Sequence, residues 1–134
     1  MVFVYALLKV EDKAEEALQV LQQADRITVP DSVRAELANV VWQWVKFKGV
    51  SEAIAFEVIQ DAESLFDDVI SSERLWVEAL QLAITADHPV YDTLFLVAAA
   101  TFDDFVVTYD KKMLARFPTQ AISAADALKR LSQE

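Results

Sequence analysis

The sequence predicts one α/β domain over residues 1–134, a three-layer α/β/α sandwich around a short and mostly parallel sheet. Short β-prone runs alternate with longer segments whose apolar residues recur at helical spacing. That alternation is typical of a parallel sheet covered by helices on both faces. No repeat, low-complexity stretch or linker rich in Pro, Gly or Ser divides the chain, which favours a single domain.

The first half of the chain predicts an apolar opening segment, one short strand and three helices. The opening VFVYALL is apolar and is either a β-prone segment or the turn from a strand into a helix. Residues 11–24 show helical spacing, and RITVP is a short strand that its proline ends. Asp31 or Ser32 can cap the next helix, Gly49 ends it, and Ser51 begins another. The apolar positions of these two long helices are Val33, Leu37, Val40, Val41 and Trp44, and then Ile54, Val58, Ile59 and Leu65.

The second half continues the alternation. DDVIS predicts a strand, and helices are expected over residues 72–85 and 89–101. FVVT predicts the next strand, residues 111–116 a short helix, AIS a further strand, and an Ala-rich helix closes the chain. Parallel α/β folds place their functional sites at the carboxyl ends of the strands, so the polar residues found there are the candidates for function.

Composition excludes several kinds of chemistry. The chain has no cysteine, one glycine and one histidine, which removes thiolate sites, glycine-rich phosphate loops and multi-histidine metal sites. The histidine, His88, precedes Pro89 and is expected in a turn with no acid–base role. The net charge of −10 argues against a broad electrostatic grip on nucleic acid. The opening residues do not read as a signal peptide and no apolar run is long enough for a membrane span, so we expect a cytoplasmic protein.

Three carboxylates stand beside apolar segments. Asp92 lies in a helix that is apolar on almost every side, Glu36 lies at the edge of an apolar stripe, and Asp110 follows a buried strand. Each also has a structural interpretation: a first-turn acid, a solvated residue and a helix cap, respectively. Parallel topology would bring all three to one edge of the sheet. Clustered carboxylates without histidine or cysteine suit Mg²⁺ or Mn²⁺, which prefer oxygen ligands.

These segments resemble motifs of the PIN domain family, and within it the VapC-like toxins of bacterial toxin–antitoxin pairs. The second family motif resembles VPDSVRAELANVVW, which contains Glu36 and Asn39. The third resembles HPVYDTLFLVAAA, which contains Asp92, and the fourth resembles VVTYDKKMLAR, which contains Asp110. The resemblance implies a ribonuclease whose three acids hold Mg²⁺ or Mn²⁺. It further implies that Asn39 helps to position one of these metal ligands without binding the metal itself. It also implies an RNA substrate and a cognate antitoxin protein.

The chain departs from the family pattern at its beginning. The first family motif is an aspartate at the end of the first strand, commonly followed two residues later by an asparagine or serine. In one alignment Met1 falls near the position of that asparagine, and in the other Tyr5 falls at the position of the aspartate. The aspartate is absent in both. We therefore expect weak binding of Mg²⁺ or Mn²⁺ and poor cleavage of RNA. The alternative function is a catalytically impaired PIN-like binding module. A phospho-acceptor signalling domain is disfavoured, since no acidic pair follows the first strand.

Further residues are candidates for contacts with partners. Basic residues near the acidic motifs are either ordinary solvated helix residues or contacts for RNA phosphates; they include Arg34, Lys111, Lys112 and Arg116. The helices between residues 31 and 65 carry more large apolar side chains than a small domain easily buries, namely Trp42, Trp44, Phe47 and Phe56. We therefore expect a homodimer with its interface on these helices.

Overall fold

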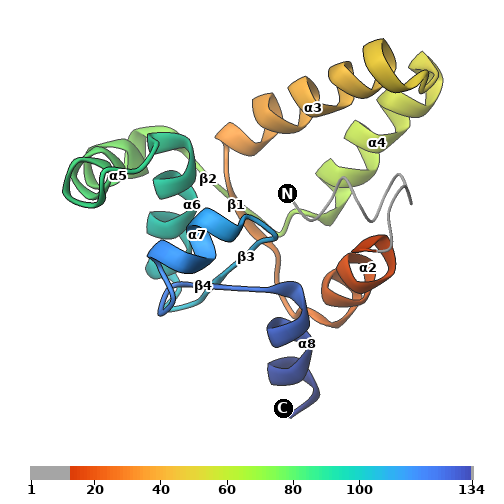
Figure 1. Ribbon diagram of the computed structural model, residues 1–134. Helices are drawn as coiled ribbons and strands as arrows, with labels where there is room; N and C mark the ends of the chain where they lie inside the picture. Colours follow the sequence, from red (N-terminus) through yellow and green to blue (C-terminus); the bar gives the residue numbers. More distant parts are fainter. Residues whose placement is uncertain (1–12, 134) are drawn as a thin grey trace.

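The computed structural model describes residues 13–133. The helices in this range are α2 (Lys13–Gln23), α3 (Ser32–Lys48), α4 (Glu52–Leu65), α5 (Ser72–Ala86), α6 (Val90–Thr101), α7 (Lys111–Arg116) and α8 (Ala124–Ser132). The strands are β1 (Thr28–Pro30), β2 (Asp68–Ile70), β3 (Val106–Val107) and β4 (Ala121–Ile122) (Figure 1). Every helix and strand predicted within this range is present, whereas the opening segment VFVYALL lies outside the described residues.

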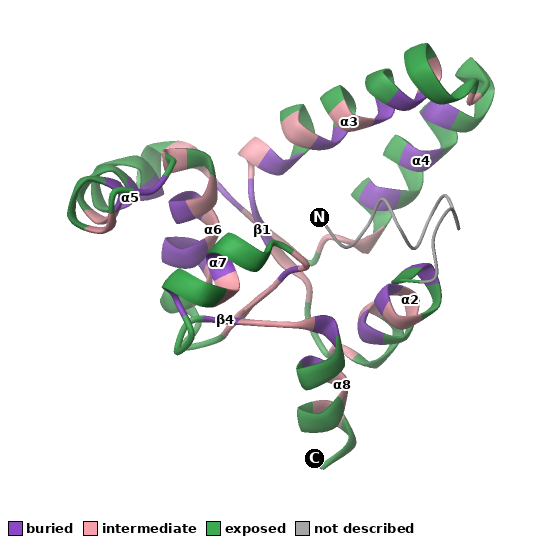
Figure 2. Cartoon of the chain, viewed as in Figure 1, coloured by how far each residue is buried: buried purple, intermediate pink, exposed green. Residues whose placement is uncertain are grey.

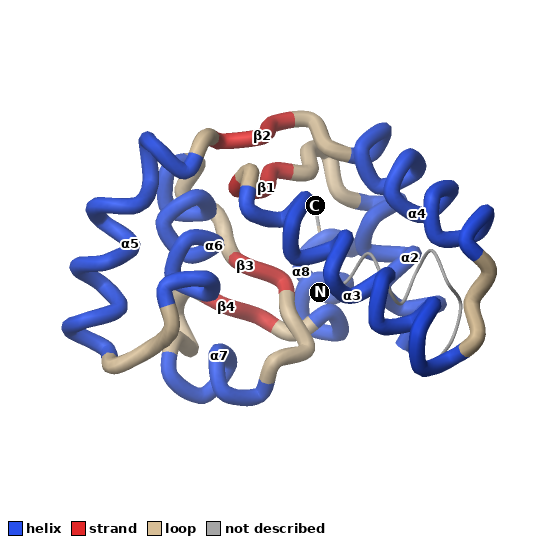
Figure 3. Tube along the Cα trace, turned by 90° about the horizontal axis from the view of Figure 1, so that it is seen from above, coloured by secondary structure: helices blue, strands red, loops and turns tan. Residues whose placement is uncertain are grey.

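The strands pair in parallel, as predicted. β1 pairs with β2, with Val29 opposite Val69, and β3 pairs with β4, with Val106 opposite Ala121. Within the described part of the chain these are two separate two-stranded sheets. Figure 3 shows the strands between α5, α6 and α7 on one side and α2, α3, α4 and α8 on the other, so the α/β class and its three layers are confirmed.

Helix α6 forms the centre of the core. It packs against α5 and contacts both β1 and β3. Its apolar residues join those of α5 in one cluster that includes Leu75, Ala79 and Leu94. Thr93 is fully buried among them, and its hydroxyl donates to the backbone oxygen of Ala79 at 2.8 Å, which satisfies the polar atom. Packing on several sides therefore fixes the position of α6.

Helices α3 and α4 form an antiparallel arm that extends from the strands (Figure 1). Gly49 ends α3 with a positive φ of 69°, a conformation that glycine adopts at low cost. The arm has its own core of Leu37, Val41, Trp44, Ala55, Val58 and Ala62. Of the apolar positions identified on α4, Ile54 and Ile59 are exposed. The small side chains of Ala55 and Ala62 are buried instead and allow the two helices to approach closely.

The arm and α5 carry large apolar side chains that are exposed, and Figure 2 shows many exposed positions along both. On the arm, Trp42, Phe47 and Phe56 are 53%, 71% and 65% exposed. Trp44, which was expected in the dimer interface as well, is buried in the core of the arm. A stripe on α5 that the sequence analysis did not identify is exposed as well; it consists of Trp76, Val77, Leu80 and Ile84. No helix among residues 13–133 is both long and apolar enough to cross a membrane.

Asp31 caps a helix other than the predicted one. It stands at the N-cap of α3 but makes no side-chain hydrogen bond to that helix. Its carboxylate instead accepts from the hydroxyl of Ser72 and, at 3.0 Å, from the Ser72 backbone N–H in the first turn of α5. These hydrogen bonds from Ser72 lower the pKa of Asp31. The carboxylate thus joins the starts of two helices that are distant in sequence.

Asp31→Ala should lower the free energy of unfolding by about 1 kcal/mol at pH 7, the usual cost of losing a cap. Because the folded-state pKa lies below the unfolded value of about 3.9, this stability is present above that pH and is lost as the pH falls through the folded-state pKa. Urea denaturation at several pH values measures the effect. The exposed Glu78→Ala change on α5 is the control, and a penalty for Asp31→Ala that persists at pH 2 would contradict this assignment.

Candidate functional site

A cavity opens between the two pairs of strands, with β1, α6 and β3 contributing to its wall. Acidic side chains outnumber basic ones along it. The acidic lining residues are Asp25, Glu36, Asp92, Asp104 and Asp110, and the basic ones are Arg26 and Arg130. An excess of carboxylates in a concave site attracts cations and repels the phosphates of a nucleic acid. The cavity therefore favours a positively charged ligand.

Glu36 is an acid of this cavity with a carboxylate oxygen that is unpartnered within residues 13–133. It lies in the second turn of α3 beside the buried Leu37, so the helix holds it half-buried at the edge of the core. Its Oε2 atom is buried without a hydrogen-bond partner among the described residues. Burial and the nearby charge of Asp92 raise the pKa of Glu36. A buried carboxylate oxygen without a partner fits a ligand for a hard cation, which would supply the missing positive charge.

Asp92 lies in the first turn of α6, as predicted, and is partly exposed to the cavity. Its Oδ2 is 2.7 Å from Nε2 of His88, four residues earlier. His88 lies in the turn between α5 and α6, as expected, but its side chain is fully buried. It is a residue of the site to which the sequence analysis gave no role. The spacing of four residues between histidine and aspartate was the available signal.

Asp110 combines two of the predicted roles. Its Oδ1 accepts from the backbone N–H groups of Lys112 at 2.8 Å and Met113 at 3.2 Å, so it caps α7. Its own N–H donates to the hydroxyl of Thr108, which holds the end of β3 against the cap. The residue also lines the cavity that contains Glu36 and Asp92. Capping and a place at the site are therefore compatible.

The three predicted acids share one cavity, but not equally closely. Glu36 and Asp92 interact electrostatically. Among residues 13–133, however, no three acidic or histidine side chains are close enough together to hold one metal ion. Asn39, one turn beyond Glu36 on α3, is exposed and is not part of the cavity wall. The positions compared with the first family motif, Met1 and Tyr5, lie outside the described residues.

Two of the four basic residues predicted to contact RNA have partners within the protein. Arg34 forms a bidentate ion pair with Glu63 of α4, with Nη2–Oε1 and Nε–Oε2 distances of 2.6 and 2.9 Å. This ion pair links the two helices of the arm. Arg116 donates to the backbone oxygens of Ala86 and Asp87 at the end of α5. Lys111 and Lys112 are exposed at the start of α7. They therefore remain the more accessible cations near Asp110.

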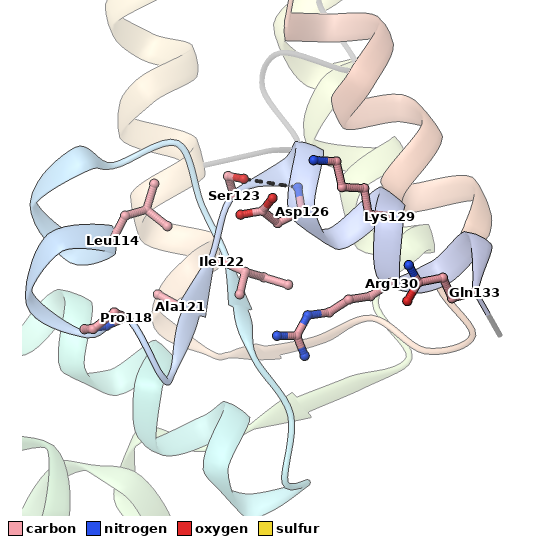
Figure 4. Close-up of a pocket in the computed structure, with 9 residues that line it drawn as sticks. All are labelled: Leu114, Pro118, Ala121, Ile122, Ser123, Asp126, Lys129, Arg130 and Gln133. Carbon is pink, nitrogen blue, oxygen red and sulfur yellow. Dashed lines mark hydrogen bonds between the residues drawn. The ribbon is translucent and has the colours of Figure 1, made fainter.

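A second hollow lies between α7, β4 and α8 (Figure 4). Its polar residues have structural tasks. Ser123 accepts from the backbone N–H of Asp126 and caps α8, while Arg130 lies over the ring of Phe105 at 4.3 Å. With one acid, Asp126, and no histidine, this hollow lacks a set of metal ligands. The acidic cavity is the better candidate for a functional site.

The chain is similar to known proteins in sequence and in fold. The family model of the PIN domain matches residues 1–119. Ribonuclease VapC3 of Pyrobaculum aerophilum is 24% identical over 115 residues, which are 84% of this chain and 88% of that protein. The crystal structure of PAE2754 from Pyrobaculum aerophilum has a similar fold, with a TM-score of 0.61 and 22% identity over 81% of this chain and 90% of that one. The family match includes the segments that carry Glu36, Asp92 and Asp110.

Glu36→Gln should stabilise the metal-free protein by about 1 kcal/mol at pH 7, as removal of a destabilised site residue often does. Because the folded-state pKa of Glu36 is raised, its ionised form costs stability as the pH rises through that pKa, and costs nothing below the unfolded value of about 4.3. The gain should therefore vanish near pH 4. Urea denaturation in EDTA measures it, with the exposed Glu57→Gln as control. A loss of stability at pH 7 would show that Glu36 has a cationic partner in the protein.

Proposed function

Because the chain belongs to the PIN domain family, we propose that it is a metal-dependent endoribonuclease that acts as the toxin of a toxin–antitoxin pair. The observation that carries the proposal is the buried, unpartnered Oε2 of Glu36 beside the charge of Asp92 in an acidic cavity. A related protein is named Ribonuclease VapC3, which supports RNA as the substrate. The cognate antitoxin would be a second protein, and both partners would meet this chain in the cytoplasm.

Glu36, Asp92 and Asp110 would hold one or two Mg²⁺ or Mn²⁺ ions through their carboxylate oxygens. Such an ion, when bound, supplies a water of lowered pKa and charge stabilisation for the departing oxygen of a phosphodiester. The chain itself supplies placement. The buried helix α6 holds Asp92, and Asp110 is held where it caps α7. Because α3 keeps Glu36 half-buried, bulk water would have limited access to this carboxylate. Asn39 is proposed to support a ligand from one turn beyond Glu36.

RNA would approach an acidic protein through a few local cations. Lys111 and Lys112, next to Asp110, are proposed as contacts for its phosphates. Arg34 and Arg116 would have to exchange their present partners, Glu63 and the carbonyls at the end of α5, to take the same role. With so few phosphate contacts, the affinity for RNA should be modest and should fall with rising salt.

A specific observation also favours the alternative function, a catalytically impaired PIN-like binding module. No group of three acidic or histidine side chains suited to one ion occurs within residues 13–133. A site with fewer carboxylates leaves Mg²⁺ with more water and a less fixed geometry. Such a protein would keep the fold and a partner surface but lose most of the chemistry.

Cleavage of RNA distinguishes the two functions. We expect slow cleavage of a labelled single-stranded RNA in the presence of Mn²⁺, and none in EDTA. Asp92→Asn should abolish it, because the change removes one of three ligand charges. Gel analysis of the RNA fragments over time measures the rate. Glu78→Gln, an exposed change on α5 remote from the cavity wall, is the matched control for loss of one acid.

Fast cleavage that persists in Asp92→Asn would show that the activity does not come from this cavity. No cleavage by the unaltered chain at any Mn²⁺ concentration, with RNA or antitoxin still bound, would favour the binding module. Either result would remove the nuclease proposal for these residues.

We further propose a homodimer whose interface includes the exposed aromatic residues of the arm. Phe47→Lys should convert a dimer to a monomer at tens of micromolar, because a charge placed in an apolar interface loses its hydration. Light scattering coupled to gel filtration measures the mass. Trp76→Lys, on the exposed stripe of α5, is the matched control. A dimer that survives Phe47→Lys but not Trp76→Lys would place the interface on α5 instead.

A further inference from the structure

The single histidine of the chain is enclosed next to the candidate site. The side chain of His88 is fully buried, and its ring packs edge-on against Phe117, with centroids 5.2 Å apart and the planes at 87°. Its backbone N–H donates to Ala83 at the end of α5. The imidazole is therefore fixed in orientation by packing and by the backbone, before any polar contact of the ring is considered.

The two ring nitrogens of His88 face groups of opposite character. Nε2 is 2.7 Å from Oδ2 of Asp92, and an ionised carboxylate only accepts hydrogen bonds. Nδ1 is 3.4 Å from Nη1 of Arg116, and a guanidinium only donates. The arrangement is satisfied when the imidazole is neutral, carries its proton on Nε2 and leaves Nδ1 as an acceptor. The positive guanidinium beside Nδ1 disfavours a proton there, which favours the form of His88 that donates from Nε2 to Asp92.

Arg116 is itself held in place. The same Nη1 donates to the backbone oxygens of Ala86 and Asp87, where α5 ends in a left-handed residue. This anchor joins α7 to the end of α5 and places the guanidinium at the ring of His88. A chain of contacts therefore runs from α7 through Arg116 and His88 to Asp92 at the cavity.

We propose that His88 is a positioning residue for Asp92: its Nε2–H, oriented by Arg116, holds one carboxylate oxygen and leaves the other directed to the cavity. The inference rests on the proposed function, because Asp92 is there a ligand of the metal ion. Groups behind a metal ligand fix its direction, and their loss typically weakens metal binding by about 10–100-fold. The proposal assigns to His88 and Arg116 a task that packing alone does not require.

The first test examines the hydrogen bond without metal or RNA. Because His88 is the only histidine, a protein labelled with ¹⁵N-histidine gives the ring signals of this residue alone. At neutral pH in EDTA we expect a proton on Nε2, slow to exchange with water, and none on Nδ1. Arg116→Met should produce a mixture of the two neutral forms, and Asp92→Ala should speed exchange of the Nε2 proton. A proton on Nδ1 in the unaltered protein would overturn the proposal.

The second test separates positioning from packing. His88→Phe keeps an aromatic ring against Phe117 but has no donor, whereas the amide nitrogen of His88→Gln can still donate to Asp92. We expect Mn²⁺ binding, measured by calorimetry on the whole chain, to weaken by about 10–100-fold in His88→Phe and to recover largely in His88→Gln. In the cleavage assay kcat should fall while KM for RNA stays unchanged.

The melting temperature of each metal-free variant shows whether the fold is intact. If His88→Phe and His88→Gln lose Mn²⁺ affinity equally, or if His88→Phe binds as tightly as the unaltered chain, the positioning role is wrong. If the unaltered chain binds no Mn²⁺, the proposed function fails, and the ring spectra in EDTA alone decide whether His88 holds Asp92. The two failures are thereby distinguished.

Discussion

The burial of α6 is the constraint on which the arrangement depends. A helix that is apolar on almost every side must be covered on several, and α5, β1 and β3 cover it. Even its buried hydroxyl, on Thr93, is satisfied by a backbone oxygen of α5. Because the first turn of this helix reaches the cavity, Asp92 stands where the core ends. The packing of the whole helix sets the position of the Asp92 backbone, and its carboxylate contacts His88 there.

The acids of the site are anchored in three different ways. Asp92 contacts the buried imidazole of His88, and Asp110 accepts hydrogen bonds from backbone amides of the helix that it caps. Glu36 lies at the edge of α3, and its Oε2 has no partner among the described residues. The carboxylates of Asp92 and Asp110 have hydrogen-bond partners, whereas burial and the charge of Asp92 raise the pKa of Glu36. The imbalance is concentrated at Glu36. A divalent cation bound at Glu36 would supply the positive charge that this carboxylate lacks.

Most of the fold could be predicted because its signals are local. Periodic apolar residues, the proline that ends β1 and the single glycine located the helices and strands within a few residues. Contacts between distant segments could not be predicted. Asp31 caps a helix 41 residues away, and Ala55, not Ile54, faces the core because the approach of α3 favours a small side chain. His88 escaped notice because its role depends on burial, while the roles of Glu36, Asp92 and Asp110 remain predictions.

The arm of α3 and α4 has a consequence for how such a protein can diverge. The chain leaves at β1 and returns at β2, and these strands are already paired, so extra residues at the exposed tip near Gly49 would add little loop-closure entropy. Glu36 lies near the base of the arm, in the second turn of α3. Insertions, deletions and surface changes at the tip would therefore leave the acid in place. Such changes would alter the exposed aromatic surface at the far end of the arm without moving Glu36 at its base.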